Sequence, residues 1–162
     1  MKFFKNIETL EELKREYKKL ALKLHPDLNQ DRDTTKDFQE MQSEYEKVFE
    51  MVKNIRRNEK GEKYTKETSE TMEEFKDVID KIIHFKNVNI EIIGSWIWLT
   101  GDTKTYKETI KELGFRWSKN KIAWYYHKDE YRKRSNKIFS LDDIREKFGS
   151  EKVQNTYQLE LA

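Results

Sequence analysis

The sequence is poor in the residues that several functional classes require. It has no cysteine among its 162 residues, which excludes a disulfide framework and thiol chemistry. Its five glycines are scattered, so there is no glycine-rich phosphate loop. The three histidines, His25, His84 and His127, include no pair at metal-ligand spacing. We therefore expect a protein that is not an enzyme and that holds neither a cofactor nor a metal.

Long hydrophobic runs are missing as well. The longest apolar stretch, near Ile92 to Leu99, is interrupted by Gly94 and Ser95 and is far shorter than the roughly 20 residues that span a bilayer. The first ten residues lack the apolar run of a signal peptide. These features predict a cytoplasmic chain with no membrane partner.

Charged and aromatic residues are abundant instead. Charged residues make up 40% of the chain, with 33 basic against 31 acidic, so the net charge of +2 does not indicate a partner. An aromatic share of 13% argues against a disordered chain, because disordered chains are poor in such residues. A length of 162 residues suits one or two small domains.

The only proline, Pro26, interrupts a helical pattern. Thr9 and Glu12 form a capping box that predicts a helix start, and Pro26 predicts that this helix ends at or before His25. One apolar stripe follows helical spacing: Leu10, Leu13, Tyr17, Leu20 and Leu24. The basic side chains lie off that stripe: Lys14, Arg15, Lys18, Lys19 and Lys23. The helix therefore has an apolar face and a mainly cationic face.

A second helical pattern follows from about Asp33 to about Asn54. Its apolar stripe consists of Phe38, Met41, Tyr45, Val48 and Val52. Two such stripes pack as an antiparallel hairpin, with His25-Pro26-Asp27 on an exposed turn at its tip. By itself the tripeptide is explained as a helix stop that contains a histidine and an aspartate. The basic and aromatic helices on its two sides favour a partner-binding loop.

The stretch from Leu13 to Val48, LKREYKKLALKLHPDLNQDRDTTKDFQEMQSEYEKV, resembles a J domain, the module of DnaJ-type co-chaperones. The matching positions are Tyr17, Leu20, Ala21, His25-Pro26-Asp27, Phe38, Met41 and Tyr45. The resemblance implies docking on a seventy-kilodalton heat-shock chaperone and stimulation of its ATPase. It assigns this docking to His25, Pro26, Asp27, Lys14, Arg15, Lys18, Lys19 and Lys23. The usual short first helix is replaced by residues 1–8, and no fourth helix is evident.

The rest of the chain predicts an α+β fold, in which the helical hairpin is followed by a small β-β-α-β-β domain and a C-terminal helix. Alternating runs on both sides of Gly94-Ser95 predict the first β-hairpin, and Ser140 with Asp143 predicts the start of the C-terminal helix. Residues 1–60 are the J-domain-like hairpin, 61–87 a linker and an amphipathic helix capped by Thr71, 88–150 the α+β module and 151–162 a tail. The polar stretch that begins at Asn54 indicates a linker or a frayed helical extension, with a domain boundary near Gly61. His84, at the edge of the third apolar stripe, has no second ligand at metal spacing and is expected to be structural.

A second candidate site is the basic, aromatic segment from Phe115 to Lys137. Cations neutralise phosphates and aromatic rings stack on unpaired bases, so the segment suits DNA or RNA. The candidate nucleic-acid-binding residues are Arg116, Lys119, Lys121, Trp124, Tyr126, Arg132, Lys133 and Arg134. The other explanation is a solvated basic face over a packed sheet, with Trp117 and Trp124 in the core. Both explanations remain open from the sequence.

The segment YKETIKELGFRWSKNKIAWYYH is also similar to small modules of phage and mobile-element proteins. The whole arrangement resembles small DnaJ-like proteins of phages and mobile elements in low-GC Gram-positive bacteria. Two functional hypotheses follow from the sequence. The first is a co-chaperone that recruits and stimulates the heat-shock ATPase. The second is an accessory protein that binds nucleic acid or a host protein without chaperone coupling, and the sequence sets no oligomeric state for either.

Overall fold

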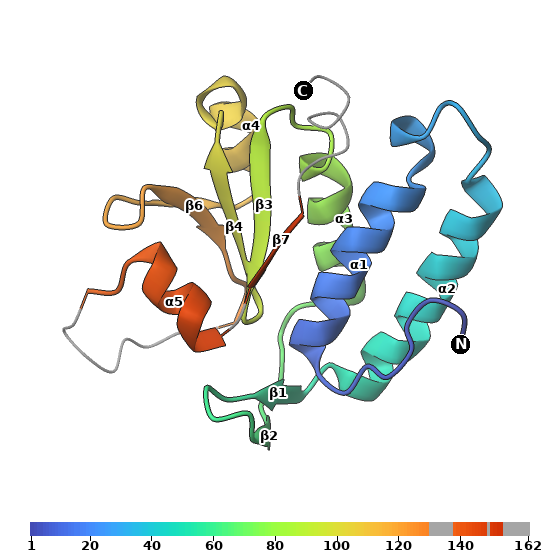
Figure 1. Cartoon of the computed structure of the whole chain (residues 1–162), viewed down its shortest axis with the longest axis horizontal. Coiled ribbons are helices and arrows are strands. Elements are labelled where there is room, and N and C mark those ends of the chain that lie inside the picture. The colour runs from blue at the N-terminus through green and yellow to red at the C-terminus, as the bar shows by residue number, and fades with distance from the viewer. Residues whose placement is uncertain (130–137, 149, 154–162) are drawn as a thin grey trace.

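The structure is a computed structural model that describes residues 1–129, 138–148 and 150–153. Three helices and a five-stranded antiparallel sheet form its main body (Figure 1). The helices and turns are α1 (Leu10–Leu24), η1 (Pro26–Leu28), α2 (Thr35–Val52), α3 (Met72–Ile82), η2 (Lys104–Tyr106), α4 (Lys107–Glu112) and α5 (Leu141–Phe148). The strands are β1 (Ile55–Arg57), β2 (Lys63–Thr65), β3 (Val88–Ile93), β4 (Trp96–Gly101), β5 (Arg116–Ser118), β6 (Ala123–Tyr126) and β7 (Ser150–Val153). The predicted α+β class is confirmed.

The helical hairpin forms as predicted. The Thr9 side chain accepts a hydrogen bond from the Glu12 amide, which satisfies one of the amides that have no partner within the helix. The two apolar stripes meet between α1 and α2, where the rings of Tyr17 and Tyr45 lie 4.5 Å apart. Both tyrosines are fully buried, so this aromatic pair lies in the centre of the core.

Carboxylates of α2 hold the N-terminal segment, and the Lys2 amine pairs with Asp37 and Glu40. Glu44 accepts hydrogen bonds from the backbone amides of Lys2, Phe3 and Phe4 at 2.8, 2.8 and 3.3 Å. Burial would raise the pKa of Glu44, but these three bonds outweigh it and lower the pKa. Phe4 is thereby placed against Tyr45 in the core. Phe4 is buried and Phe3 and Ile7 pack against the same core, so residues 1–8 cover the hairpin without a helix.

The predicted linker after α2 is a β-hairpin. Strands β1 and β2 pair through residues 55–57 and 63–65, and Gly61 adopts a left-handed φ of 84° in the loop between them. The Asn58 side chain accepts the amides of Lys60 and Glu62, which closes the loop. The sequence predicted a linker or a frayed helical extension here and missed the hairpin, because the polar composition reflects solvent-exposed strands rather than a lack of structure. The predicted boundary near Gly61 falls within this loop.

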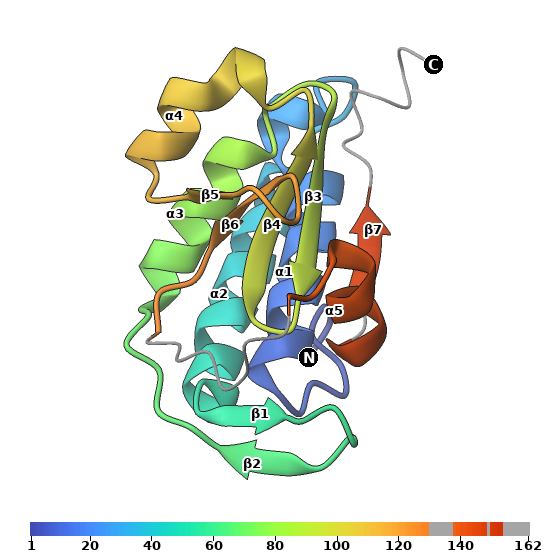
Figure 2. The same cartoon turned by 90° about the vertical axis from the view of Figure 1, so that its left-hand side faces the viewer.

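The helices and the sheet share one hydrophobic core. The strand order is β5-β6-β4-β3-β7, and α1 and α3 cover one face of this sheet while α2 lies on the far side of α1 (Figures 1 and 2). Phe75 and Ile79 of α3 join the buried residues of the hairpin to Ile90 and Ile97 of the sheet. Helix α3 therefore packs on both parts, and the α1–α2 hairpin buries its apolar face only with the C-terminal sheet in place.

The opposite face of the sheet is covered by α5. Ser140 and Asp143 form the predicted capping box, and Leu141 and Ile144 pack on Trp98. Arg145 donates two hydrogen bonds to the buried carboxylate of Glu91 on β3, at 2.6 and 2.8 Å. This bidentate pair fixes α5 to β3.

Two details of the C-terminal part differ from expectation. Trp124 is buried, as the packed-sheet explanation expects, whereas Trp117 is 44% exposed on the edge strand β5. Residues 150–153, for which no strand was predicted, form β7 and pair with β3. None of the helices in the described part of the chain is both long and apolar enough to cross a membrane.

Candidate functional site

The loop between α1 and α2 presents an aspartate to solvent. His25 leaves helical geometry, with φ −60° and ψ 126°, because Pro26 follows it, and Pro26 then begins the short turn η1. The His25 ring packs edge-on against Phe38 at 5.0 Å between centroids, and its Nδ1 accepts the Asp27 amide at 3.2 Å. The Asn29 side chain donates to the His25 carbonyl at 2.9 Å. These contacts hold the loop, and the Asp27 side chain remains 69% exposed.

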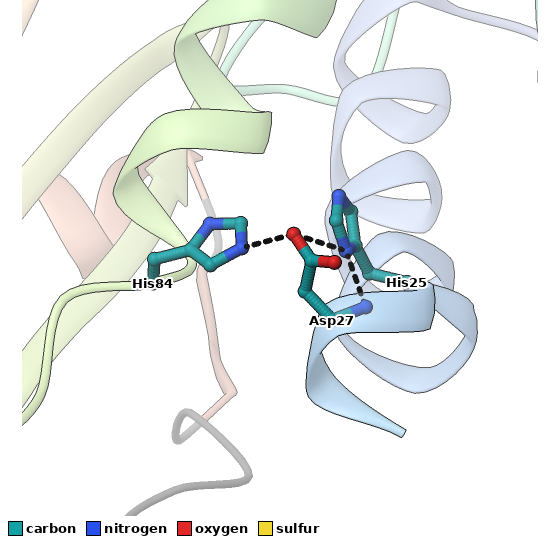
Figure 3. A group of neighbouring side chains, drawn as sticks. All are labelled: His25, Asp27 and His84. Carbon is teal, nitrogen blue, oxygen red and sulfur yellow. Dashed lines mark hydrogen bonds and ion pairs between the residues drawn. The ribbon is translucent and has the colours of Figure 1, made fainter. Parts of the chain in front are cut away.

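A histidine from α3 meets this loop. His84 lies just beyond the C-terminal end of α3, and its Nε2 is 3.2 Å from Oδ2 of Asp27 (Figure 3). The His25 and His84 rings are edge-on at 5.0 Å between centroids. Among the residues that the structure describes, His25, Asp27 and His84 form a group whose ligand atoms all lie within 4.8 Å of one another. The fold thus supplies the neighbouring ligands that residue spacing did not reveal.

Burial and a neighbouring histidine shift the pKa of His25 downward. Burial lowers the pKa of His25, and the adjacent His84 lowers it further, while the nearby carboxylates of Asp80 and Asp27 oppose this. Burial also raises the pKa of Asp80, to which the Tyr17 hydroxyl donates at 3.3 Å. His25 therefore presents an unprotonated Nδ1 to the Asp27 side of the loop, as its hydrogen bond from the Asp27 amide requires.

Two of the five predicted docking cations are internal. Lys14 forms an ion pair with Glu70 at 2.5 Å and donates to the Ser95 carbonyl at 3.1 Å. Lys18 is fully buried and donates to the carbonyl of Ile90 on β3 at 3.1 Å. The expectation that all five cations form one solvated face was wrong for Lys14 and Lys18. The side of α1 that carries these two lysines packs against the sheet, where they bond to Ser95 and Ile90. Neither amine is accessible to a partner in this conformation.

The remaining cations of α1 lie nearer the surface. Arg15 donates to the Phe148 carbonyl of α5 at 2.8 Å. Lys19 is partly exposed and lies 3.9 Å from Glu16, one turn earlier on the helix. Lys23 is exposed, two residues before His25. The exposed basic surface of α1 is therefore concentrated at its C-terminal end, next to Asp27.

The predicted nucleic-acid-binding residues are only partly brought together. Arg116 and Lys119 are exposed on β5 and the following turn, and the Lys121 amine lies 5.8 Å from the ring of Trp98. Trp124 is buried, so the expectation of base stacking on its ring was wrong in this conformation. Tyr126 is half-buried against Phe115. The other three candidates, Arg132, Lys133 and Arg134, lie outside the described residues.

Two residues of interest were not identified from the sequence. His84 is 57 positions from Asp27, and no spacing rule joins them, because their contact depends on how α3 packs beside α1. Trp117 was assigned to the core, although its alternation with Arg116 on a short edge strand left its face undetermined.

The comparisons with known proteins concern the N-terminal third of the chain. Residues 4–57 match a family model described as "DnaJ domain". This range covers α1, η1, α2 and β1. No curated protein and no solved structure matches the chain.

Proposed function

Residues 4–57 are a DnaJ domain, and from this premise we propose that the protein recruits a seventy-kilodalton heat-shock chaperone and stimulates its ATPase through the His25-Pro26-Asp27 loop and the C-terminal end of α1. In this proposal the chain catalyses no reaction itself. Its DnaJ domain suggests co-chaperone function in general, and the partner and the coupling are the proposed part.

The exposed carboxylate of Asp27 is the observation that carries the proposal. It lies at the tip of the hairpin, on a loop whose shape is fixed by Pro26, by the packing of His25 on Phe38 and by the Asn29 side chain. A carboxylate on such a fixed turn is able to accept charge-assisted hydrogen bonds from an arginine of a partner. Exposure of Asp27 and burial of His25 divide the motif into one residue that meets the partner and one that holds the loop.

The positions of the lysines on α1 decide which of them are able to contact the partner. Lys14 and Lys18 are bound to Glu70, Ser95 and Ile90 and so hold the sheet against α1. Lys19 and Lys23 lie toward the exposed end of the helix. We therefore assign docking to Lys19, Lys23 and Asp27, with cationic side chains steering the domain toward an acidic surface.

The test is steady-state ATP hydrolysis by the heat-shock chaperone in the presence of the full chain. We expect stimulation by the wild type and its loss in Asp27→Asn, which keeps the size of the side chain and removes its charge. Asp31→Asn is the matched control, because Asp31 is an exposed aspartate on the same loop. Equal stimulation by the wild type and Asp27→Asn would contradict the proposal.

A second candidate function is favoured by one observation, the exposed ring of Trp117 on the edge strand β5, in a segment that also carries the exposed cations Arg116 and Lys119. An exposed ring beside cations suits stacking on an unpaired base. The test is binding of single-stranded DNA at low salt. Weaker binding by Trp117→Ala, together with unchanged binding by Trp96→Phe, would support this function. Absence of binding by the wild type would remove it.

A further inference from the structure

We propose that His25, Asp27 and His84 form a binding site for a divalent transition-metal ion such as zinc, which would join the loop of the DnaJ domain to the end of α3. The three side chains lie within one small surface region (Figure 3). Two imidazoles and one carboxylate are a ligand set suited to zinc and to other divalent transition metals.

The tautomer of His84 is the first argument. Its Nδ1 lies 2.7 Å from the backbone carbonyl of Asp80, and a carbonyl only accepts, so Nδ1 carries the hydrogen. In a neutral His84, Nε2 then carries no hydrogen and has a free lone pair. This atom lies 3.2 Å from Oδ2 of Asp27. Two acceptors at this distance repel each other unless a cation lies between them. A metal ion or a proton on Nε2 removes that repulsion.

His25 supplies a third possible ligand atom. Its Nδ1 lies 3.9 Å from the same Oδ2 of Asp27 and accepts the Asp27 amide, so it is unprotonated. A proton on Nε2 of His84 would join only His84 and Asp27. A metal ion uses the lone pairs of both nitrogens and of the carboxylate together.

The surroundings of His84 match those of metal-ligating histidines. Such histidines commonly donate the other ring N–H to a backbone carbonyl, which fixes the ring orientation and the tautomer. The bond from Nδ1 of His84 to the Asp80 carbonyl is an interaction of this kind. It leaves Nε2 as the ligand atom and orients it toward Asp27.

The distances require only a small adjustment. Tetrahedral zinc with ligands at about 2.0–2.1 Å places neighbouring ligand atoms roughly 3.3 Å apart. One pair already lies at 3.2 Å, a second at 3.9 Å, and all three atoms within 4.8 Å. The side chains of Asp27 and His84 are exposed enough to rotate, at 69% and 39%. Upon metal binding, the Asp27 amide would exchange its bond to His25 for one to water.

Metal binding would have a consequence for the DnaJ domain, and this consequence alone rests on the proposed function. The ion would use the carboxylate of Asp27, which is the group assigned to the partner. It would also hold α3 against η1. A loaded site is therefore expected to lower ATPase stimulation, so that the metal acts as a switch on the docking loop.

The direct test uses the full chain without a chaperone. Cobalt(II) and zinc(II) titrations are followed by visible absorption and by calorimetry, for the wild type, His84→Ala and Asp27→Asn. We expect one ion per chain, and at least about tenfold weaker binding in both variants, since loss of even an outer-shell partner commonly costs that much. His127→Phe is the matched control, because it removes the remaining histidine away from the site and should leave the affinity unchanged. Circular dichroism checks that each variant is folded.

Two results would overturn the site: no saturable binding by the wild type, or wild-type affinity in His84→Ala. Because these titrations contain no chaperone, their outcome is separate from the proposed function, which fails instead if the metal-free protein gives no stimulation. In the ATPase assay, zinc should lower the stimulation by the wild type and not that by His84→Ala, which also controls for any effect of zinc on the chaperone. Equal effects of zinc on both proteins would contradict the switch.

Discussion

Two regions of α1 carry the same residue type in opposite environments. Lys14 and Lys18 are buried against the sheet and donate to Ser95 and Ile90, whereas Lys23 at the end of the helix is exposed next to the Asp27 loop. In the sequence the three lysines belong to one cationic face. The difference shows that an amphipathic pattern identifies where charges lie, while tertiary packing decides whether they meet solvent or a carbonyl. The buried lysines hold α1 to the sheet, and the exposed end is the part that we propose for docking.

The largest expected effect is at the buried end, in the ion pair of Lys14 and Glu70. Its side chains are 5% and 2% exposed. Glu70→Ala leaves an unpaired buried ammonium group, which we expect to cost about 3–5 kcal/mol in unfolding free energy. Denaturant unfolding measures this. The double variant Lys14→Met/Glu70→Met removes both charges and should be much less destabilised, and a cost below about 1 kcal/mol for Glu70→Ala would contradict the buried pair.

The next effect compares two lysines of the same helix directly. Lys18→Ala removes a buried four-carbon stem and the hydrogen bond to Ile90, so we expect a loss of about 2 kcal/mol or more. Lys23→Ala changes only an exposed side chain and should stay within about 0.5 kcal/mol. Both are measured by the same denaturant unfolding. Equal losses would show that the two ends of α1 do not differ in the way described.

A smaller effect depends on pH and again concerns the buried end. Burial, with a smaller contribution from the charge of the nearby Lys14, lowers the pKa of His127 from 6.5 to about 4. The unfolded chain therefore binds more protons between these values, so stability is fully present above about pH 6.5 and is lost as the pH falls toward 4. We expect the unfolding temperature to fall less between pH 7 and pH 5 in His127→Phe, which keeps a ring against Trp96. An identical fall in both proteins would contradict this.

The smallest effect on stability is expected at the exposed end of α1, where a substitution should instead affect association with the chaperone. Lys23→Glu should leave the unfolding free energy within about 0.5 kcal/mol. It should slow association with the acidic surface of the chaperone, and the difference should shrink at high salt. Lys119→Glu makes the same charge change on the β5–β6 turn and serves as the control. Identical association rates for Lys23→Glu and the wild type would remove Lys23 from the docking surface.

Local signals predicted much of the fold. The capping pairs that begin at Thr9, Thr71 and Ser140 gave three helix starts correctly, since a cap depends only on neighbouring residues. Alternation around Gly94-Ser95 gave the β3–β4 hairpin, in which Gly94 adopts a left-handed φ of 60°. Each of these features is decided within about a dozen residues of sequence.

Features that depend on contacts between distant segments were not predictable. The polar composition near Gly61 concealed a hairpin whose Arg56 is paired with Asp129, more than 70 positions away. Burial would raise the pKa of Asp129, but hydrogen bonds from Ser69 and Thr68 and the charge of Arg56 lower it, so this carboxylate joins three segments. His84 is a similar case. The contact of His84 with Asp27 depends on the packing of α3 beside α1, and no pattern in the sequence indicates it.

Hydrogen–deuterium exchange of the full chain, with and without the heat-shock chaperone, tests the central claim most directly. If docking uses the exposed end of α1 while the buried lysines keep holding the sheet, amides of residues 19–28 gain protection and those of β3 keep theirs. If the chaperone instead releases the amides of β3 around Ile90, α1 separates from the sheet on docking. That result would contradict the division of α1 into a structural part and a docking part.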